Sequence, residues 1–142
     1  MKFFSLENLP MNFLVPDMYK IKNRDFEKIE NEFLIPSEKL IFVAPEYNGS
    51  IPGVLKAFID ACDVKKCFYF KKAALVGVSD GRSGNSRGMD HLTQILLHLK
   101  ITVLPMRTHV SNVDTHLNDQ KKIIHQPTID LIGRQLDWML KF

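Results

Sequence analysis

The sequence predicts a doubly wound α/β fold around a parallel sheet, and three observations support this. Strand-like and helix-like segments alternate along the 142 residues. The middle strand candidates are apolar at consecutive positions, which is typical of strands covered by helices on both faces. Two of these candidates end in polar, glycine-containing loops, as strands do at the ligand-binding edge of such sheets.

Length and composition indicate a single globular domain over residues 1–142. Hydrophobic residues make up 45% and charged residues 25% of the chain, as is usual for globular proteins. The formal net charge is only +3 and the lysines are scattered, which favours anionic small molecules over nucleic acid as partners. No apolar stretch approaches the ~20 residues of a membrane helix, and Glu7, Asn8 and Pro10 interrupt the apolar amino terminus before a secretion signal can form. We therefore expect a cytoplasmic location and no membrane partner.

Two strands and two helices are predicted in the first half of the chain. Residues 2–6 are a short strand candidate, and residues 39–44 are a second, more apolar one. Between them, Asn23 can cap a helix that Pro36 limits, and its apolar residues at spacings of three and four are Phe26, Ile29 and Phe33. Residues 54–62 form the second helix, whose apolar positions follow a period of 3.6 residues: Val54, Leu55, Phe58, Ile59 and Cys62.

The second half continues the alternation. Residues 73–78 are the third strand, and residues 101–104, closed by Pro105, are the fourth. The helix over residues 86–99 between them is apolar at Leu92, Ile95, Leu96 and Leu99. After a polar stretch, Pro127 opens a last helix. Its predicted apolar side consists of Ile129, Ile132, Leu136 and either Met139 or Leu140.

Counting these helices predicts that one face of the sheet is only half covered. If the crossovers are right-handed and the strands lie in sequence order, the three connecting helices share one face. Only the last helix remains for the other face. A helix about 10 Å wide covers roughly two strands that are about 4.8 Å apart. Half of the second face should therefore stay bare, so that a covering element is missing or is supplied by a partner.

Two loops carry the functional signal. Residues 44–53 (APEYNGSIPG) connect the second strand to its helix, and residues 79–85 (SDGRSGN) follow the third strand. Parallel strands end at the same edge, so the two loops should converge on one ligand. The first loop resembles the flavin-contacting loop of the NADPH-dependent FMN reductase family, which is flavodoxin-like and includes quinone, azo-dye and chromate reductases. The second loop resembles the family pattern Ser-x-Gly-x-x-Gly-Gly, with Asn85 where a further glycine is common and Arg87-Gly88 near the usual Arg-Ala pair.

The resemblance implies a flavodoxin-like, three-layer α/β/α domain that is incomplete at its amino terminus. In the family a first strand, a phosphate-binding loop and a first helix precede the segment that looks like residues 1–19. The gene product is accordingly expected to be longer, with Met1 an internal start. The resemblance also implies a homodimer or a homotetramer.

The same resemblance implies FMN as cofactor, NADPH or NADH as co-substrate, and a quinone, azo or flavin compound as small-molecule electron acceptor. No catalytic side chain is expected, because a flavin performs its own hydride chemistry. Arg82 or Arg87 could attract the phosphates of NADPH. The residues that the resemblance assigns to FMN are Pro45, Glu46, Tyr47, Asn48, Gly49, Ser50, Ser79, Gly81, Arg82 and Gly84.

Other functions remain open at this point. The half-covered sheet favours a non-catalytic remnant of the fold that acts as an interaction or assembly module with weak or no flavin binding, and an electron-transfer flavodoxin is a weaker alternative. A hydrolase is disfavoured because the GxSxG pattern is missing. No metal site is expected. His91 and His98 lack a third ligand at metal spacing, and Cys62 and Cys67, five apart, fit neither a CxxC pair nor a zinc knuckle and are expected to be ordinary thiols.

Overall fold

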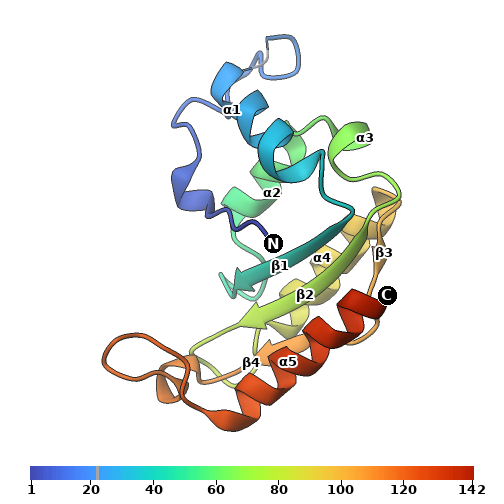
Figure 1. Cartoon of the computed structure of the whole chain (residues 1–142). Helices are drawn as coiled ribbons and strands as arrows, with labels where there is room; N and C mark the ends of the chain where they lie inside the picture. The colour runs from blue at the N-terminus through green and yellow to red at the C-terminus, as the bar shows by residue number, and fades with distance from the viewer. Residues whose placement is uncertain (22) are drawn as a thin grey trace.

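The computed structural model describes residues 1–21 and 23–142, and Figure 1 shows the arrangement of its elements. The strands are β1 Lys39–Pro45, β2 Lys72–Val78, β3 Thr102–Val103 and β4 Thr108–Val110. The α-helices are α1 Arg24–Ile29, α2 Gly53–Ala61, α3 Val64–Cys67, α4 Ser86–His98 and α5 Gln126–Lys141. Shorter elements are the 3-10 turns Leu6–Asn8 and Val113–His116 and the π-helical turn Glu30–Leu34. Within the described residues, no helix is both long enough and apolar enough to cross a bilayer.

The sheet is parallel, with β2 at its centre. β1 pairs with the whole length of β2, and β3 and β4 share the other edge of β2. Pro105 lies between β3 and β4, and proline cannot donate a ladder hydrogen bond. The fourth predicted strand is therefore present as β3, but it is shorter than predicted. After Pro105 the chain pairs with β2 again as β4. The sequence prediction missed β4, because it has only three residues in a polar stretch.

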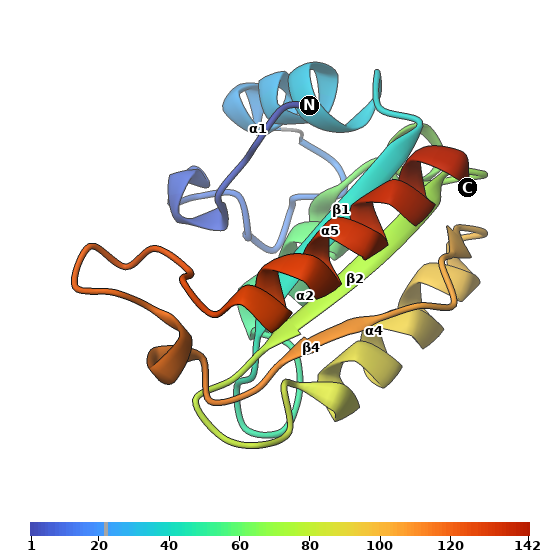
Figure 2. The same cartoon turned by 60° about the horizontal axis from the view of Figure 1, so that its bottom comes forward.

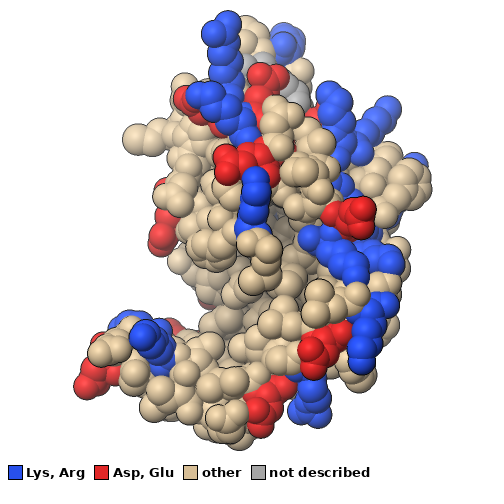
Figure 3. Space-filling model, viewed as in Figure 1, with Lys and Arg blue, Asp and Glu red and all other residues tan. Residues whose placement is uncertain are grey.

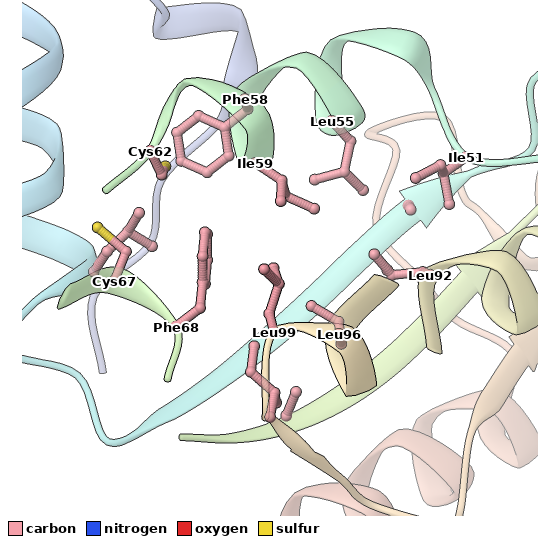
Figure 4. Close-up of a cluster of buried hydrophobic side chains, with 14 of the residues drawn as sticks. Ile51, Leu55, Phe58, Ile59, Cys62, Cys67, Phe68, Leu92, Leu96 and Leu99 are labelled. Carbon is pink, nitrogen blue, oxygen red and sulfur yellow. The ribbon is translucent and has the colours of Figure 1, made fainter. Parts of the chain in front are cut away.

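Helices cover both faces of the sheet, which confirms the predicted three-layer α/β/α architecture. α2 and α4 lie on one face and α5 on the other (Figures 1 and 2). The crossovers that contain α2 and α4 join strands that are neighbours in sequence order, and right-handed connections place such helices on one face. Figure 4 shows the main core that this layer buries. Its completely or almost completely buried members include Phe58, Ile59, Phe68, Leu75, Leu92 and Leu96.

The first predicted strand is wrong. Residues 1–5 have no regular structure, and Leu6–Asn8 is a 3-10 turn. The segment is held by side chains instead of a backbone ladder, since the Phe4 ring lies 5.1 Å from that of Phe33 and 6.1 Å from that of Phe58. A strand exists only where another strand pairs with it, and local sequence cannot supply that partner.

One face of β1 is bare, as the helix count predicts. Ile41 is 38% and Val43 63% exposed, whereas β2 is buried on both faces. The expectation of two buried faces is thus correct for β2 and wrong for β1. Few charged side chains lie over β1 and the adjoining side of α5 (Figure 3). The bare region is therefore apolar as well as exposed.

The predicted apolar side of α5 is only partly correct. Met139 is buried and Ile132 is half-buried, but Ile129, Leu136 and Leu140 are exposed. The residues that the helix buries are Thr128, Gln135 and Met139. Gln135 explains the orientation, because its side-chain amide donates to Leu75 O at 2.8 Å and to Met106 O at 3.0 Å. Both carbonyls lie beside the interruption between β3 and β4, so that Gln135 replaces ladder bonds that the broken strand cannot make.

Replacing Gln135 by leucine tests whether its two side-chain hydrogen bonds stabilise the fold where the strand is interrupted. The variant keeps a comparable volume and adds apolar surface, but it leaves two buried carbonyls without their donor. We expect the free energy of unfolding to fall by about 1–3 kcal/mol, measured by urea denaturation. Leu136→Gln, at the exposed neighbouring position, is the matched control and should change stability by less than about 0.5 kcal/mol. A Gln135→Leu protein as stable as wild type would contradict the assignment.

Candidate functional site

The loop after β1 is a tight turn with both of its central residues in the left-handed region. Tyr47 and Ser50 exchange backbone hydrogen bonds of 2.9 and 3.1 Å, and φ is 51° at Asn48 and 74° at Gly49. Asn-Gly is the pair that such a type I′ turn prefers. The amides of Tyr47 and Ser50 close the turn. Those of Asn48 and Gly49 face outward and have no hydrogen-bond partner in the described part of the chain.

The loop after β2 is braced from within. The Ser79 hydroxyl donates to Gly81 O at 2.7 Å and accepts from the Gly84 amide at 2.9 Å. Gly84 has a φ of 54°, and a Cβ placed on it would lie 2.9 Å from the backbone carbonyl carbon of His109. Ser79 and Gly84 are both buried. Their part is therefore to shape the loop, and their side-chain positions are not open to a ligand.

Asn85 joins the two loops into one unit. It is completely buried, and its side-chain amide donates to Ala44 O and to Pro45 O, both at 3.0 Å, where β1 ends. The Ser83 hydroxyl donates to the Glu46 carboxylate, which adds a second link. Figure 2 shows the two loops side by side beyond the carboxyl ends of the strands. The predicted convergence is thus present.

The predicted contact residues divide into two groups. Ser79 and Gly84 belong to the buried frame just described. The other eight lie at the surface of the converged loops, either exposed or half-buried: Pro45, Glu46, Tyr47, Asn48, Gly49, Ser50, Gly81 and Arg82. The Tyr47 ring is 61% exposed, so that an aromatic face is available beside the Asn48-Gly49 turn.

Sequence reasoning missed how α4 supports this surface. The Ser50 hydroxyl lies 2.8 Å from His91 Nδ1, one turn into the helix. The Arg87 guanidinium lies against the Asn48-Gly49 turn, because a Cβ on Gly49 would be 3.7 Å from Arg87 Nη1. Between them, Gly88 lets the helix approach, since a Cβ there would lie 2.8 Å from the carbonyl carbon of Ser50. The sequence did contain a signal: His91 follows Gly88 by three residues and Arg87 by four, so all three lie near one face of the same helix.

A third loop, after β4, contributes to the same edge. The amides of Asn112 and Val113 donate to Gly81 O at 2.9 Å and to Ser79 O at 3.1 Å. Through these bonds, residues 111–116 fasten the outer side of the Ser79 loop. The contact was missed together with β4, because without that strand the segment has no predicted position.

Charged residues of both signs lie at this edge. The Arg107 guanidinium donates to the Asp90 carboxylate, and this hydrogen bond, followed by the Coulomb attraction, lowers the pKa of Asp90. That pair is neutral as a whole. Glu46, which accepts from the Ser83 hydroxyl, and the exposed Asp80 are the acidic residues of the two loops. Arg82 and Arg87 remain as exposed cations next to the turn.

A hollow of about 330 Å³ lies at the opposite, amino-terminal edge of the strands. Its lining includes Lys39, Lys71 and Lys72, but these ammonium groups already have partners. Lys39 donates to Met139 O and Leu140 O, and Lys71 to Leu34 O at 2.5 Å. Burial lowers the pKa of Lys71. We assign the candidate site to the carboxyl edge, because its outward amides and cations are not used by the chain itself.

Comparison with known proteins supports this assignment. Residues 1–115 match the family described as NADPH-dependent FMN reductase. An NAD(P)H-dependent FMN reductase of Pseudomonas aeruginosa is 34% identical over 103 residues, which are 70% of this chain and 56% of that protein. A 2-hydroxy-1,4-benzoquinone reductase of a Burkholderia species is 25% identical over 111 residues, 73% of this chain and 61% of that protein. The chain thus spans less than two thirds of these relatives.

The fold has a counterpart among solved structures. The flavoenzyme NAD(P)H:(acceptor) oxidoreductase FerB from Paracoccus denitrificans superposes with a TM-score of 0.76. The sequence identity is 22%, and the match covers 96% of this chain and 78% of that one. The similarity confirms the flavodoxin-like arrangement of the sheet and its helices.

Proposed function

Because the chain belongs to the NADPH-dependent FMN reductase family, we propose that its converged loops hold the isoalloxazine ring of FMN in an NAD(P)H-dependent oxidoreductase. The observation that carries the proposal is the clamp of Asn85 on the end of β1, which makes one surface of two loops. When bound, FMN would supply the chemistry, in which a hydride from NAD(P)H is passed on to an electron acceptor. The protein's part is to bind and orient, so no acid or base is assigned.

The Asn48-Gly49 turn fits the polar edge of a flavin. Its two outward amides are preorganised donors, and such donors stabilise negative charge that develops on a ligand. Gly49 has no side chain to keep the backbone at a distance. Tyr47 would lie beside the ring, and Pro45, Glu46, Ser50, Gly81 and Arg82 would complete the contact surface, with Ser79 and Gly84 shaping it from behind.

Arg82 and Arg87 are proposed to attract the phosphates of NADPH or NADH. Both are exposed at the edge where the flavin is proposed to bind, and a guanidinium matches phosphate in a bidentate manner. Exchanging Arg87 for alanine should raise the KM for NADPH and leave FMN affinity nearly unchanged, whereas Arg82→Ala, at a proposed flavin contact, should weaken both. This comparison separates an NADPH contact from a flavin contact.

The electron acceptor is proposed to be a small quinone, with azo compounds and free flavins as the other members of the same class. A benzoquinone reductase among the relatives supports quinones first. The protein is further proposed to be cytoplasmic and to form a homodimer or homotetramer, which light scattering on the purified chain would measure.

FMN titration tests the proposal directly. We expect flavin fluorescence to change saturably, the melting temperature to rise with FMN, and NADPH to be oxidised in the presence of FMN and a benzoquinone. Gly49→Ala should weaken FMN binding about fivefold, because alanine is strained at a φ of 74° by roughly 1 kcal/mol and the turn would relax away from the flavin. Gly53→Ala is the matched control, since a Cβ there meets open space at the start of α2.

A second function is favoured by the bare apolar region of β1 and α5. Ile41, Val43 and Leu140 are exposed there, which suits an interaction or assembly module with weak or no flavin binding. A protein that neither melts higher with FMN nor oxidises NADPH, and that forms a stable assembly, would favour this alternative. Saturable FMN binding that Gly49→Ala weakens would rule it out.

A further inference from the structure

Three chemically reactive side chains meet inside the protein, away from the proposed flavin surface. One ligand atom each of Glu30, Cys62 and Cys67 lies within 4.8 Å of the other two. The three residues come from the π-helical turn Glu30–Leu34, the end of α2 and α3. α2 runs from the carboxyl edge of β1 to the opposite edge, so this cluster lies at the amino-terminal edge of the strands. Figure 4 shows both cysteines at one end of the main core.

Glu30 occupies a position where the helix pattern calls for an apolar residue. Phe26, Glu30 and Leu34 follow one another at intervals of four, and their exposed fractions are 5%, 3% and 8%. A carboxylate is costly to bury unless it has strong partners or a metal ion. The π-helical turn begins at Glu30 itself, and such turns are frequent at functional sites.

Hydrogen bonds from the chain orient this carboxylate. Glu30 Oε1 accepts from the Asp63 amide at 2.5 Å and from the Cys67 thiol at 3.5 Å. These contacts hold the carboxylate between the two cysteines. A carboxylate oxygen that accepts an amide hydrogen bond can also bind a cation, and outer contacts of this kind commonly orient metal ligands.

We propose that Glu30, Cys62 and Cys67 bind a zinc ion. Two thiolates and one carboxylate are a ligand set that zinc accepts. With ordinary zinc–sulfur and zinc–oxygen bonds, a tetrahedral ion separates a sulfur and an oxygen ligand by about 3.5 Å, which is the distance observed between Cys67 Sγ and Glu30 Oε1. The fourth position is left to a water molecule.

Binding is a proton exchange without oxidation or reduction. Each thiol loses its proton to solvent as its sulfur bonds to zinc, and Glu30 binds through its carboxylate form. Three anionic ligands on a divalent ion leave one negative charge. Lys66 lies near the cluster: its bond to Asp63 raises its pKa first, and Coulomb attraction to Glu30 and Cys67 adds to this. This cation offsets part of the negative charge.

Cobalt provides a test with little background, because the chain has only two cysteines. Titrating Co²⁺ into the reduced full chain should produce a thiolate-to-cobalt absorption band that saturates at one ion per chain and is abolished by Zn²⁺. The apparent affinity for cobalt should fall by at least about tenfold in Cys62→Ser, Cys67→Ser and Glu30→Gln. Zinc should also protect both thiols of the wild-type protein from alkylation.

The matched control removes the other cluster that could take up cobalt. The rings of His116 and His125 stack with their centroids 4.1 Å apart, so the double variant His116→Ala/His125→Ala should keep the full thiolate band. Absence of the band in reduced wild-type protein would overturn the proposal, as would a full band in either serine variant. If the two thiols only form a disulfide in air and the reduced protein binds no metal, the proposal is also wrong. The wild-type titration needs no variant to fold, and FMN binding tests the proposed flavin function separately.

Discussion

Replacing Gly77 by alanine is expected to lower the free energy of unfolding by about 3 kcal/mol, in the upper range for overpacked sites. A Cβ on this residue would lie 2.3 Å from the backbone oxygen of Gly84, 3.0 Å from Met89 Cγ and 3.2 Å from Asn85 Cβ. The nearest atom belongs to the backbone of the loop that follows β2, so a side-chain rotation cannot relieve the clash. The whole loop must move away from β2. Chemical denaturation measures the effect.

Gly81→Ala is the matched control for this variant. Gly81 lies in the same loop, a Cβ on it meets nothing within 4 Å, and its φ is outside the left-handed region. Its stability should stay within about 0.5 kcal/mol of wild type. Under the proposed function, Gly77→Ala should also lose most of its FMN affinity at temperatures where it is still folded. Equal stabilities of the two variants would show that the close approach of Gly84 to β2 is not a constraint.

Local pattern predicted the elements whose stability depends on local burial. β1, β2, α2 and α4 were all found, because a run of apolar residues or a 3.6-residue period indicates the element itself, although in β1 the run did not mean that both faces are covered. Residues 2–6 and β4 were wrong or missed for a single reason: a short strand depends on a neighbour that is distant in sequence. Gln135 shows the same limit for a helix. Its hydrogen bonds to Leu75 O and Met106 O help to set which side of α5 faces the sheet, and the apolar pattern of the helix does not report them.

The position of the candidate site could be predicted from the sequence, but the contacts that join its two loops could not. Topology alone brings the ends of β1 and β2 to one edge, so the convergence of the loops followed from the strand order. The residue that joins them did not, because Asn85 acts on carbonyls forty residues earlier. Glu30 was missed in a similar way. Its spacing to Phe26 and Leu34 places it on the buried side of the helix, but the predicted apolar positions were Phe26, Ile29 and Phe33.

Replacing Asn85 by alanine is expected to lower the free energy of unfolding by about 2–4 kcal/mol, since a buried group left without its partner costs about 1–3 kcal/mol. The carbonyls of Ala44 and Pro45 would both lose their donor. Asn85 also has a φ of 57°, a conformation in which alanine is less stable than asparagine. The change therefore removes a clamp and adds backbone strain at one position.

Asn112→Ala separates these two effects. Asn112 has a φ of 48° and is exposed, so alanine there introduces the strain and breaks no buried clamp. We expect it to cost roughly 1 kcal/mol or less, and FMN binding to stay within a factor of two or so of wild type. In Asn85→Ala the loop after β1 loses its buried attachment to the start of α4 and keeps only the exposed ones, so its affinity for FMN should fall by more than its stability at the assay temperature explains. Equal losses in both variants would mean that backbone strain accounts for the role of Asn85, and that the two loops do not need its amide to form one surface.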